Sequence, residues 1–174
     1  MSKTYIITDT HFNGNVYANP NYTQTIFNYW STIVGPDDTI IHGGDICSGS
    51  WNKVSEQIAS MPGKKILVRG NHDGAKDEKY LEVFDEVYKT YIDVENDVVY
   101  SHYPVDAEIY NCKYNIFGHF HKYPQNMKDS LVRRYKTFFD FNRNFTFCIV
   151  DWEYKPVEVQ VFLKKCIDHA KFCV

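Results

Sequence analysis

KILVRGNHD, residues 65–73, joins an apolar run to a glycine and three polar side chains. Residues 65–68 have the length and composition of a buried strand. Gly70 permits a sharp turn where that strand ends. Open α/β sheets bind ligands beyond the carboxyl ends of their strands, so this stretch predicts both an α/β fold and the edge at which its site lies.

The same pattern, a short strand followed by polar residues, occurs four more times along the chain. The expected strands and their polar followers are residues 5–7 with Asp9 and His11, 39–41 with Asp45, 98–100 with His102, and 114–117 with His119 and His121. The pairs Asp9-x-His11 and His119-x-His121 are spaced by two, so both members point to one side of a strand. If the five strands share one sheet edge, these side chains converge on one crevice.

Helices are expected between the strands of the first half, because apolar residues recur at helical spacing in residues 23–33 and 51–60, and the acidic residues 76–84 are also expected to be helical. Strands that alternate with helices favour βαβ units and a parallel sheet. The second half is richer in strands. Its expected elements are a hairpin of residues 88–94 and 97–100, a closing strand pair of residues 145–150 and 157–162, and a short helix at 163–172. A mixed α/β sandwich fits both halves.

The composition is that of an ordinary globular protein, with 44% hydrophobic and 24% charged residues. A length of 174 residues fits one domain, so residues 1–174 are expected to form it. The net charge of -3 excludes non-specific duplex binding through overall charge. Five cysteines without a CxxC pair suggest neither a thiolate zinc site nor a disulfide framework. With no signal peptide and no run long enough to span a membrane, we expect a cytoplasmic protein without a membrane partner.

The polar residues after the strands form a mixed ligand set of two carboxylates, one carboxamide and four imidazoles. The set comprises Asp9, His11, Asp45, Asn71, His102, His119 and His121. One tetrahedral ion takes four ligands, so seven candidates suggest two ions that share a carboxylate. Two ions about 3.5–4 Å apart are the usual clamp for in-line displacement at phosphorus. Oxygen and nitrogen donors without thiolate favour Mn²⁺, with Fe, Zn²⁺, Ni²⁺ or Co²⁺ as alternatives.

Five ordered motifs of this chain resemble those of the calcineurin-like metallophosphoesterases. They are Asp9-x-His11, Gly44-Asp45, Gly70-Asn71-His72-Asp73, His102 and Gly118-His119-x-His121. The chain is similar to the small, single-domain bacterial and phage phosphoesterases of that superfamily. The resemblance implies a four-layer α/β/β/α sandwich of two mixed sheets flanked by helices, and a metal-dependent phosphoric ester hydrolase, with phosphodiesterase favoured over phosphatase.

The resemblance also implies a role for each matching residue. Asp9, His11, Asp45 and His121 would hold the first ion, and Asn71, His102 and His119 the second, with Asp45 bridging. A hydroxide held by the two ions would attack in line. His72 would contact a phosphoryl oxygen and protonate the leaving group, and Asp73 would lie behind His72 and set its tautomer and pKa.

Two other functions stay open on the sequence alone. Some proteins of this fold are scaffolds that use a degraded metal site to bind other proteins, but here His72 is present and every ligand position is filled. A nuclease acting on nucleic-acid ends is the other alternative. Residues 122–143 hold six basic against two acidic residues, interleaved with aromatics. That segment suits contact with a nucleotide or nucleic acid, but equally a solvated insert or a dimer contact, so monomer and homodimer both stay open.

Two further polar residues near the motifs have competing interpretations. His42 precedes Gly43, and a satisfied core histidine is favoured over a partner of the metal ligands. Arg69 precedes Gly70, and it suits either phosphate contact or a solvated strand end.

Overall fold

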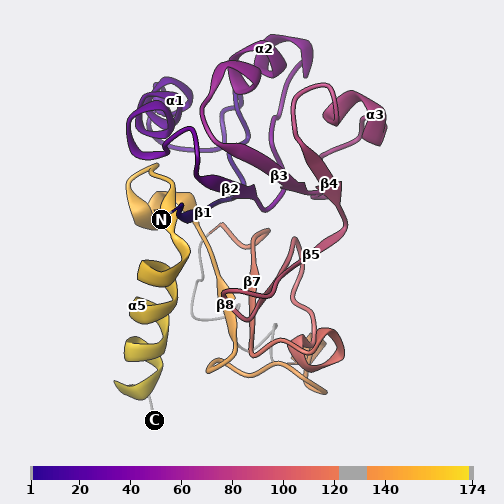
Figure 1. The fold of residues 1–174 in the computed structure, drawn as a ribbon, viewed down its shortest axis with the longest axis vertical. Helices are drawn as coiled ribbons and strands as arrows, with labels where there is room; N and C mark the ends of the chain where they lie inside the picture. The colour runs from indigo at the N-terminus through magenta and orange to yellow at the C-terminus, as the bar shows by residue number, and fades with distance from the viewer. Residues whose placement is uncertain (1, 122–132, 173–174) are drawn as a thin grey trace.

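Two mixed β-sheets form the centre of the structure, a computed structural model that describes residues 2–121 and 133–172 (Figure 1). The first sheet has the strand order β4-β3-β2-β1-β9. Its strands are β1 (Thr4–Ile7), β2 (Thr39–His42), β3 (Lys64–Val68), β4 (Glu86–Tyr88) and β9 (Val157–Glu158). The strands β1 to β4 are parallel, and β9 lies antiparallel to β1.

The second sheet has the order β5-β6-β7-β8. Its strands are β5 (Thr90–Asp93), β6 (Val98–Ser101), β7 (Tyr114–Phe117) and β8 (Asn144–Thr146). β5 and β6 form the antiparallel hairpin predicted from the sequence, whereas β6, β7 and β8 are parallel. The predicted α/β class, with two mixed sheets flanked by helices, is therefore confirmed.

Three helices cover the outer face of the first sheet: α1 (Tyr22–Ile33), α2 (Asn52–Ser60) and α3 (Asp77–Tyr80) (Figure 1). In α1 the spacing of Ile26, Phe27 and Trp30 places all three on the buried side. In α2 the same is true of Val54 and Ile58. Beside the second sheet lie α5 (Val159–Phe172) and the short 3₁₀ helix η1 (Ala107–Tyr110), and a second 3₁₀ helix, η2 (Ile149–Trp152), precedes β9 in the chain.

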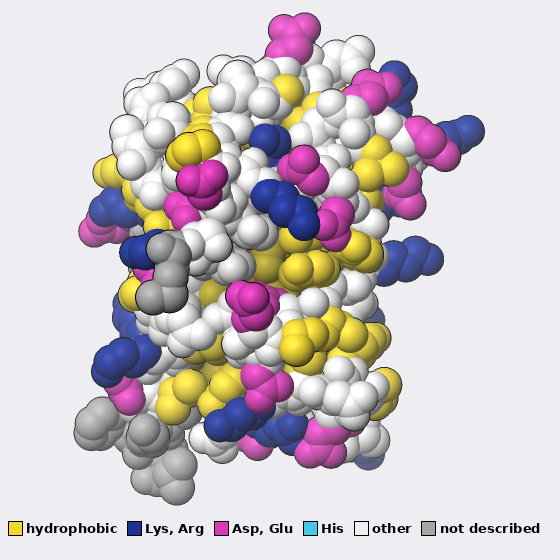
Figure 2. Space-filling view, viewed as in Figure 1, with side chains coloured by type: hydrophobic (Ala, Val, Ile, Leu, Met, Phe, Trp, Pro, Cys, Tyr) yellow, Lys and Arg dark blue, Asp and Glu magenta, His cyan; other side chains and the backbone are white. Residues whose placement is uncertain are grey.

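The hydrophobic core joins the two sheets. Ile6, Ile41 and Ile66 of the first sheet and Tyr100 and Ile116 of the second are at most 1% exposed and belong to one cluster. The central strands β1, β2 and β3 of the first sheet are buried on both faces, as parallel strands usually are, whereas β4 at the edge is partly exposed. The outside carries acidic and basic side chains interspersed on the face shown in Figure 2, in keeping with the small net charge. Within the described residues, no helix is long and apolar enough to cross a membrane.

The predicted strand of residues 88–94 is wrong as one element. It breaks at Lys89, where the chain leaves the first sheet after β4 and enters the second as β5. The predicted helix at 76–84 is shorter, since its α-helical part is α3 alone.

The predicted closing strand pair of residues 145–150 and 157–162 is also wrong. β8 pairs with β7 in the second sheet, whereas β9 pairs with β1 in the first. The alternation of Val157, Val159 and Val161 resembles a strand, but Val159, Phe162 and Leu163 are the buried residues. That spacing is helical, so α5 begins at Val159, earlier than predicted, and Val161 is 52% exposed.

Candidate metal centre

The five polar motifs meet at one place, but two sheets supply them rather than one edge. Asp9 and His11 follow β1, Asp45 follows β2, and Asn71 follows β3 of the first sheet. His102 follows β6 of the second sheet, and His119 and His121 follow β7. The carboxyl ends of β1, β2, β3, β6 and β7 therefore face a common space between the sheets.

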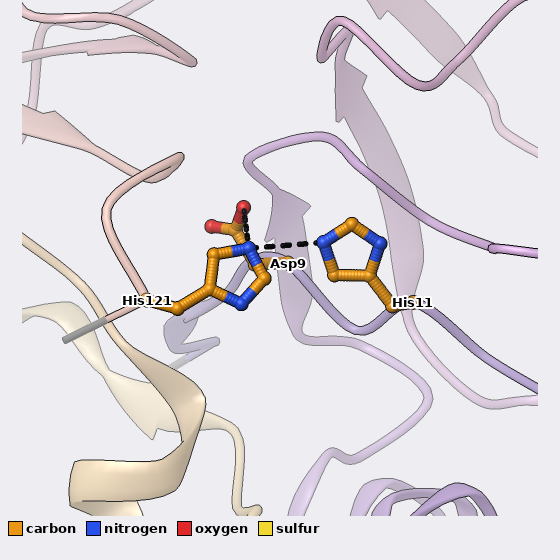
Figure 3. A group of neighbouring side chains, drawn as sticks. All are labelled: Asp9, His11 and His121. Atoms are coloured by element: carbon orange, nitrogen blue, oxygen red, sulfur yellow. Dashed lines mark hydrogen bonds and ion pairs between the residues drawn. The ribbon is translucent and has the colours of Figure 1, made fainter. Parts of the chain in front are cut away.

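The first group consists of Asp9, His11 and His121 (Figure 3). The Nε2 atoms of His11 and His121 lie 3.0 Å apart, and Nε2 of His121 lies 3.5 Å from Oδ1 of Asp9. One ligand atom from each residue lies within 4.8 Å of the others. Asp9 and His11 are buried, whereas the His121 side chain is 30% exposed, so the group opens to solvent on the His121 side.

The second group consists of Asp45, His102 and His119, whose ligand atoms also lie within 4.8 Å of one another. Asn71 joins it, because its Oδ1 lies 3.0 Å from Nε2 of His102. Oδ2 of Asp45 lies 3.3 Å from that nitrogen and 3.8 Å from Nε2 of His11 in the first group. One carboxylate oxygen thus faces both groups, the position that a bridging ligand needs.

Hydrogen bonds on the far side of three imidazoles aim their Nε2 atoms into the centre. Nδ1 of His102 lies 3.0 Å from the carbonyl oxygen of Gly43, which only accepts, so in the neutral ring Nδ1 carries the proton. Nδ1 of His11 lies 3.0 Å from Oγ of Ser48. Nδ1 of His121 lies 3.3 Å from the hydroxyl of Tyr17, which donates its own proton to the Asp9 carbonyl.

This donor set fits divalent cations. In the neutral ring with the proton on Nδ1, Nε2 of His102 presents a lone pair to Oδ1 of Asn71 and Oδ2 of Asp45, and two Nε2 atoms meet in the first group. Lone pairs that converge in a buried space repel unless a proton or a cation lies among them. Imidazoles oriented by a hydrogen bond at the other nitrogen are the usual form of metal-binding histidine.

Four of the candidate ligands have backbone conformations that L-residues rarely adopt. The φ angles of Asp9, His11, Asp45 and His119 are 52°, 40°, 55° and 67°. Such strain costs about 1–3 kcal/mol at each residue, and it clusters at functional sites. Of the glycines beside these ligands, Gly43, Gly44, Gly70 and Gly118, Gly44 alone has a positive φ, at 96°. The strain lies largely in the ligands themselves.

Gly70 is required because a side chain would not fit at this position, whereas its backbone φ is not in the left-handed region. A Cβ at Gly70 would lie 2.2 Å from Oδ1 and 2.5 Å from the backbone nitrogen of Asp45. At Gly118 a Cβ would lie 2.3 Å from Oδ2 of Asp9. Both glycines therefore allow the backbone to pass directly against a candidate metal-binding carboxylate.

Burial dominates the electrostatics of the centre. Burial raises the pKa of Asp9 to about 7, although the charge of His102 and hydrogen bonds from Thr8 and His119 oppose the rise. Burial and the neighbouring His121 lower the pKa of His11 to about 4, so this ring is neutral at physiological pH. For Asp45, burial alone would raise the pKa, but hydrogen bonds from His102 and the His72 backbone, together with the charges of His102 and His11, lower it. Neutral imidazoles and ionised carboxylates are the forms that bind metal.

His72 lies at the mouth of the centre. Its backbone nitrogen donates to Oδ1 of Asp45 at 2.8 Å, and its ring nitrogen Nε2 lies 4.0 Å from Oδ2 of the same residue. The His72 side chain is 60% exposed. It therefore lies beside the candidate ligands but faces solvent, where a substrate would approach.

Asp73 has partners other than those expected. Its carboxylate accepts hydrogen bonds from the backbone nitrogens of Asp45 at 2.9 Å, Ile46 at 3.0 Å and Gly70 at 2.7 Å. These bonds tie the loop after β3 to the loop after β2. The carboxylate therefore holds the backbone beneath the centre, and among the described residues no bond joins it to the His72 ring.

His42 and Arg69 are structural. His42 is fully buried, accepts from the backbone nitrogen of Gly44 at Nδ1, and contacts the Thr10 hydroxyl at 2.9 Å through Nε2. The guanidinium of Arg69 bonds to Asp77 at 2.6 Å and to the carbonyl of Ala75 at 2.9 Å. The preferred core interpretation of His42 thus agrees with the structure, and Arg69 is engaged within its own loop.

Sequence reasoning missed Tyr17, Ser48 and Tyr103. Tyr17 and Ser48 contact the outer nitrogens of His121 and His11, and the Tyr103 hydroxyl donates to Oδ1 of Asn71 at 3.0 Å. Tyr103 alone had a sequence signal, since it follows His102 directly. Of the basic and aromatic segment 122–143, residues 122–132 lie outside the described part of the chain.

The fold and the centre define a metallophosphoesterase, and the chain belongs to the calcineurin-like phosphoesterase family, whose model matches residues 2–103. Membership of this family agrees with the two groups of side chains that can hold divalent metal ions. The matched range ends before His119 and His121, so these two candidate ligands rest on the geometry of the centre.

Two curated proteins are similar to parts of this chain. The Gene 66 protein of Mycobacterium phage L5 is 41% identical over 56 residues, 30% of this chain and 27% of that protein. The uncharacterized protein MJ1445 of Methanocaldococcus jannaschii is 31% identical over 84 residues, 42% of this chain and 48% of that protein. The matches thus span less than half the length of these relatives.

The fold is also similar to a solved structure, that of AQ665 from Aquifex aeolicus, described as a protein of unknown function. The TM-score is 0.70 at 25% sequence identity, over 94% of this chain and 99% of the other. The likeness extends beyond residue 103 and includes the second sheet.

Proposed function

We propose that this protein is a dinuclear metal-dependent phosphoesterase that favours phosphodiesters over phosphomonoesters. The observation that carries the proposal is the position of Asp45, whose Oδ2 faces His11 of one ligand group and His102 of the other. A bridging carboxylate between two groups of buried donors suits two adjacent cations. Two adjacent cations suit displacement at phosphorus.

Each proposed ligand serves the ion of the group in which its side chain lies. Asp9, His11 and His121 serve the first ion, Asn71, His102 and His119 the second, and Asp45 both. When bound, the ions would acidify water to give a nucleophile near neutral pH and would neutralise phosphoryl charge. Mn²⁺ is the favoured ion, because the set combines carboxylate and carboxamide oxygens with imidazoles.

His72 is the proposed general acid. Hydrolysis forms one P–O bond to the oxygen of water and breaks the P–O bond to the leaving alcohol, which must receive a proton. The ring of His72 is solvent-facing and anchored by its backbone to Asp45, so it can hold that proton at the mouth of the centre. Asp73 is the proposed positioning residue, since it fixes the backbone that carries both Asp45 and His72.

The preference for diesters rests on the open mouth of the centre. His72 is 60% and His121 30% exposed, which leaves room for a second ester group on phosphorus. The cytoplasm is the proposed location, because Cys47, Cys112, Cys148 and Cys166 are free thiols, as in a reducing compartment.

The test is hydrolysis of bis-4-nitrophenyl phosphate beside 4-nitrophenyl phosphate by metal-stripped protein resupplied with Mn²⁺. We expect turnover of the diester that needs both Mn²⁺ and His72. Turnover of the monoester alone would make the protein a phosphatase. Two bound ions without turnover of either ester would contradict the proposal and favour a scaffold role.

A further inference from the structure

A rim of three residues borders the second ligand group on its solvent side: Tyr103, Arg134 and Tyr135. The ring of Tyr103 lies 4.3 Å from the ring of His119, and its hydroxyl bonds to Asn71. Tyr103 is 37% exposed. Tyr103 therefore touches two candidate metal ligands and still faces solvent.

Arg134 and Tyr135 continue this rim from a distant part of the sequence. The guanidinium carbon of Arg134 lies 5.6 Å from the centroid of the Tyr135 ring, a cation–π arrangement. The charge of Arg134 reaches both Tyr103 and His119, since it favours deprotonation of each and so acts to lower both pKa values. Arg134 is exposed and forms no ion pair within the described part of the chain.

A groove of about 390 Å³ adjoins the rim. It begins two residues after His102, and its lining is mainly apolar and aromatic. The lining includes Val105, Asp106, Ile109, Tyr110, Tyr135 and Phe138. The volume falls within the usual range of small-molecule sites. Tyr135 belongs to both rim and groove, so the groove lies next to the rim that borders the second ligand group.

We propose that this groove binds the nucleoside part of a phosphodiester whose phosphorus lies at the metal centre, a proposal that rests on the proposed function. A nucleobase offers a flat π-face that stacks on an aromatic side chain such as Tyr135. Arg134, which forms no ion pair among the described residues, places a positive charge beside that ring and near enough to Tyr103 and His119 to act on both, where it can attract the negative phosphate of such a substrate. An aliphatic ester would leave both the stacking ring and the groove unused.

The test compares two diesters with the same leaving group, thymidine 5′-(4-nitrophenyl) phosphate and methyl 4-nitrophenyl phosphate, on Mn²⁺-loaded protein. We expect kcat/KM to be at least about tenfold higher for the thymidine ester. In Tyr135→Ala the ratio of the two kcat/KM values should fall about tenfold, the effect of losing one stacking partner, mainly through KM. Lys136→Ala removes a positive charge from the same exposed segment outside the groove, and it should keep the wild-type ratio.

Equal kcat/KM values for the two esters, or an unchanged ratio in Tyr135→Ala, would overturn the inference while leaving the proposed phosphodiesterase intact. If neither ester is hydrolysed, the proposed function fails, and binding of thymidine 5′-monophosphate decides the inference. Binding that weakens at least fivefold in Tyr135→Ala but not in Lys136→Ala supports the groove as a nucleoside site. Binding that is absent or equal in all three proteins overturns it.

Discussion

Gly70→Ala offers a direct test of how tightly the centre is built. The new Cβ would lie 2.2 Å from Oδ1 and 2.5 Å from the backbone nitrogen of Asp45, whereas unstrained contacts of carbon need about 3.5 Å. The loops must therefore separate by about 1 Å. Neither neighbour is a flexible chain end, because Asp45 is held by Asp73 and has a φ of 55°.

Overpacking of this kind costs about 1–3 kcal/mol of unfolding free energy. For a chain of this size that corresponds to a fall in Tm of roughly 3–10 °C. A displacement of about 1 Å at a reacting centre lowers turnover about 10²-fold. Thermal unfolding, Mn²⁺ binding and hydrolysis of bis-4-nitrophenyl phosphate measure the three effects separately.

Gly74→Ala is the matched control in the same loop. A Cβ at Gly74 has nothing within 4 Å, so this variant should keep wild-type metal binding and turnover. A small gain in stability, about 0.4–1 kcal/mol, is expected from the less flexible unfolded chain. If Gly70→Ala matched Gly74→Ala in Tm, metal binding and turnover, the close approach of this loop to Asp45 would be refuted.

Four further substitutions test the assigned roles. His72→Ala should bind two equivalents of Mn²⁺ in a titration yet lose kcat by about 10²–10⁴-fold, as expected for a general acid. Asp45→Ala should lose Mn²⁺ from both positions; a variant that keeps one tight ion would contradict a shared ligand. Tyr17→Phe should weaken Mn²⁺ binding by about 10–100-fold in a competition assay with unchanged circular dichroism, because His121 loses its hydroxyl partner. Asp73→Asn should lower the unfolding free energy by about 2–4 kcal/mol in urea, because one carboxamide oxygen cannot accept from three amides; wild-type stability would show that these bonds contribute little.

The first half of the fold could be predicted because its strands are distinct apolar runs with turns between them. Residues 5–7, 39–41 and 65–68 give β1, β2 and β3 to within a residue or two. The switch of sheets at Lys89 could not be predicted, because β4 and β5 follow one another almost without a gap. β4 pairs with the earlier strand β3, whereas β5 pairs with the following strand β6, so two consecutive strands join different sheets.

The candidate ligands could be proposed because their residue types are chemically distinctive and follow strand ends. Tyr17 and Ser48 gave no such signal, since tyrosine and serine in loops are common and their contacts with His121 and His11 depend on tertiary packing. The three bonds of Asp73 run to backbone nitrogens. Backbone amides are the same at every residue, so no sequence pattern marks those partners.

Both ligand groups draw on both sheets, and this has a consequence for how the chain is made. Asp9 and His11 leave the ribosome 110 residues before their partners His119 and His121. Until those late residues arrive, the early half holds only part of each cation site, so a nascent or truncated chain has no complete centre to load. The full set of proposed ligands can therefore hold metal ions only after the two sheets have met, and the proposed hydrolysis requires that step.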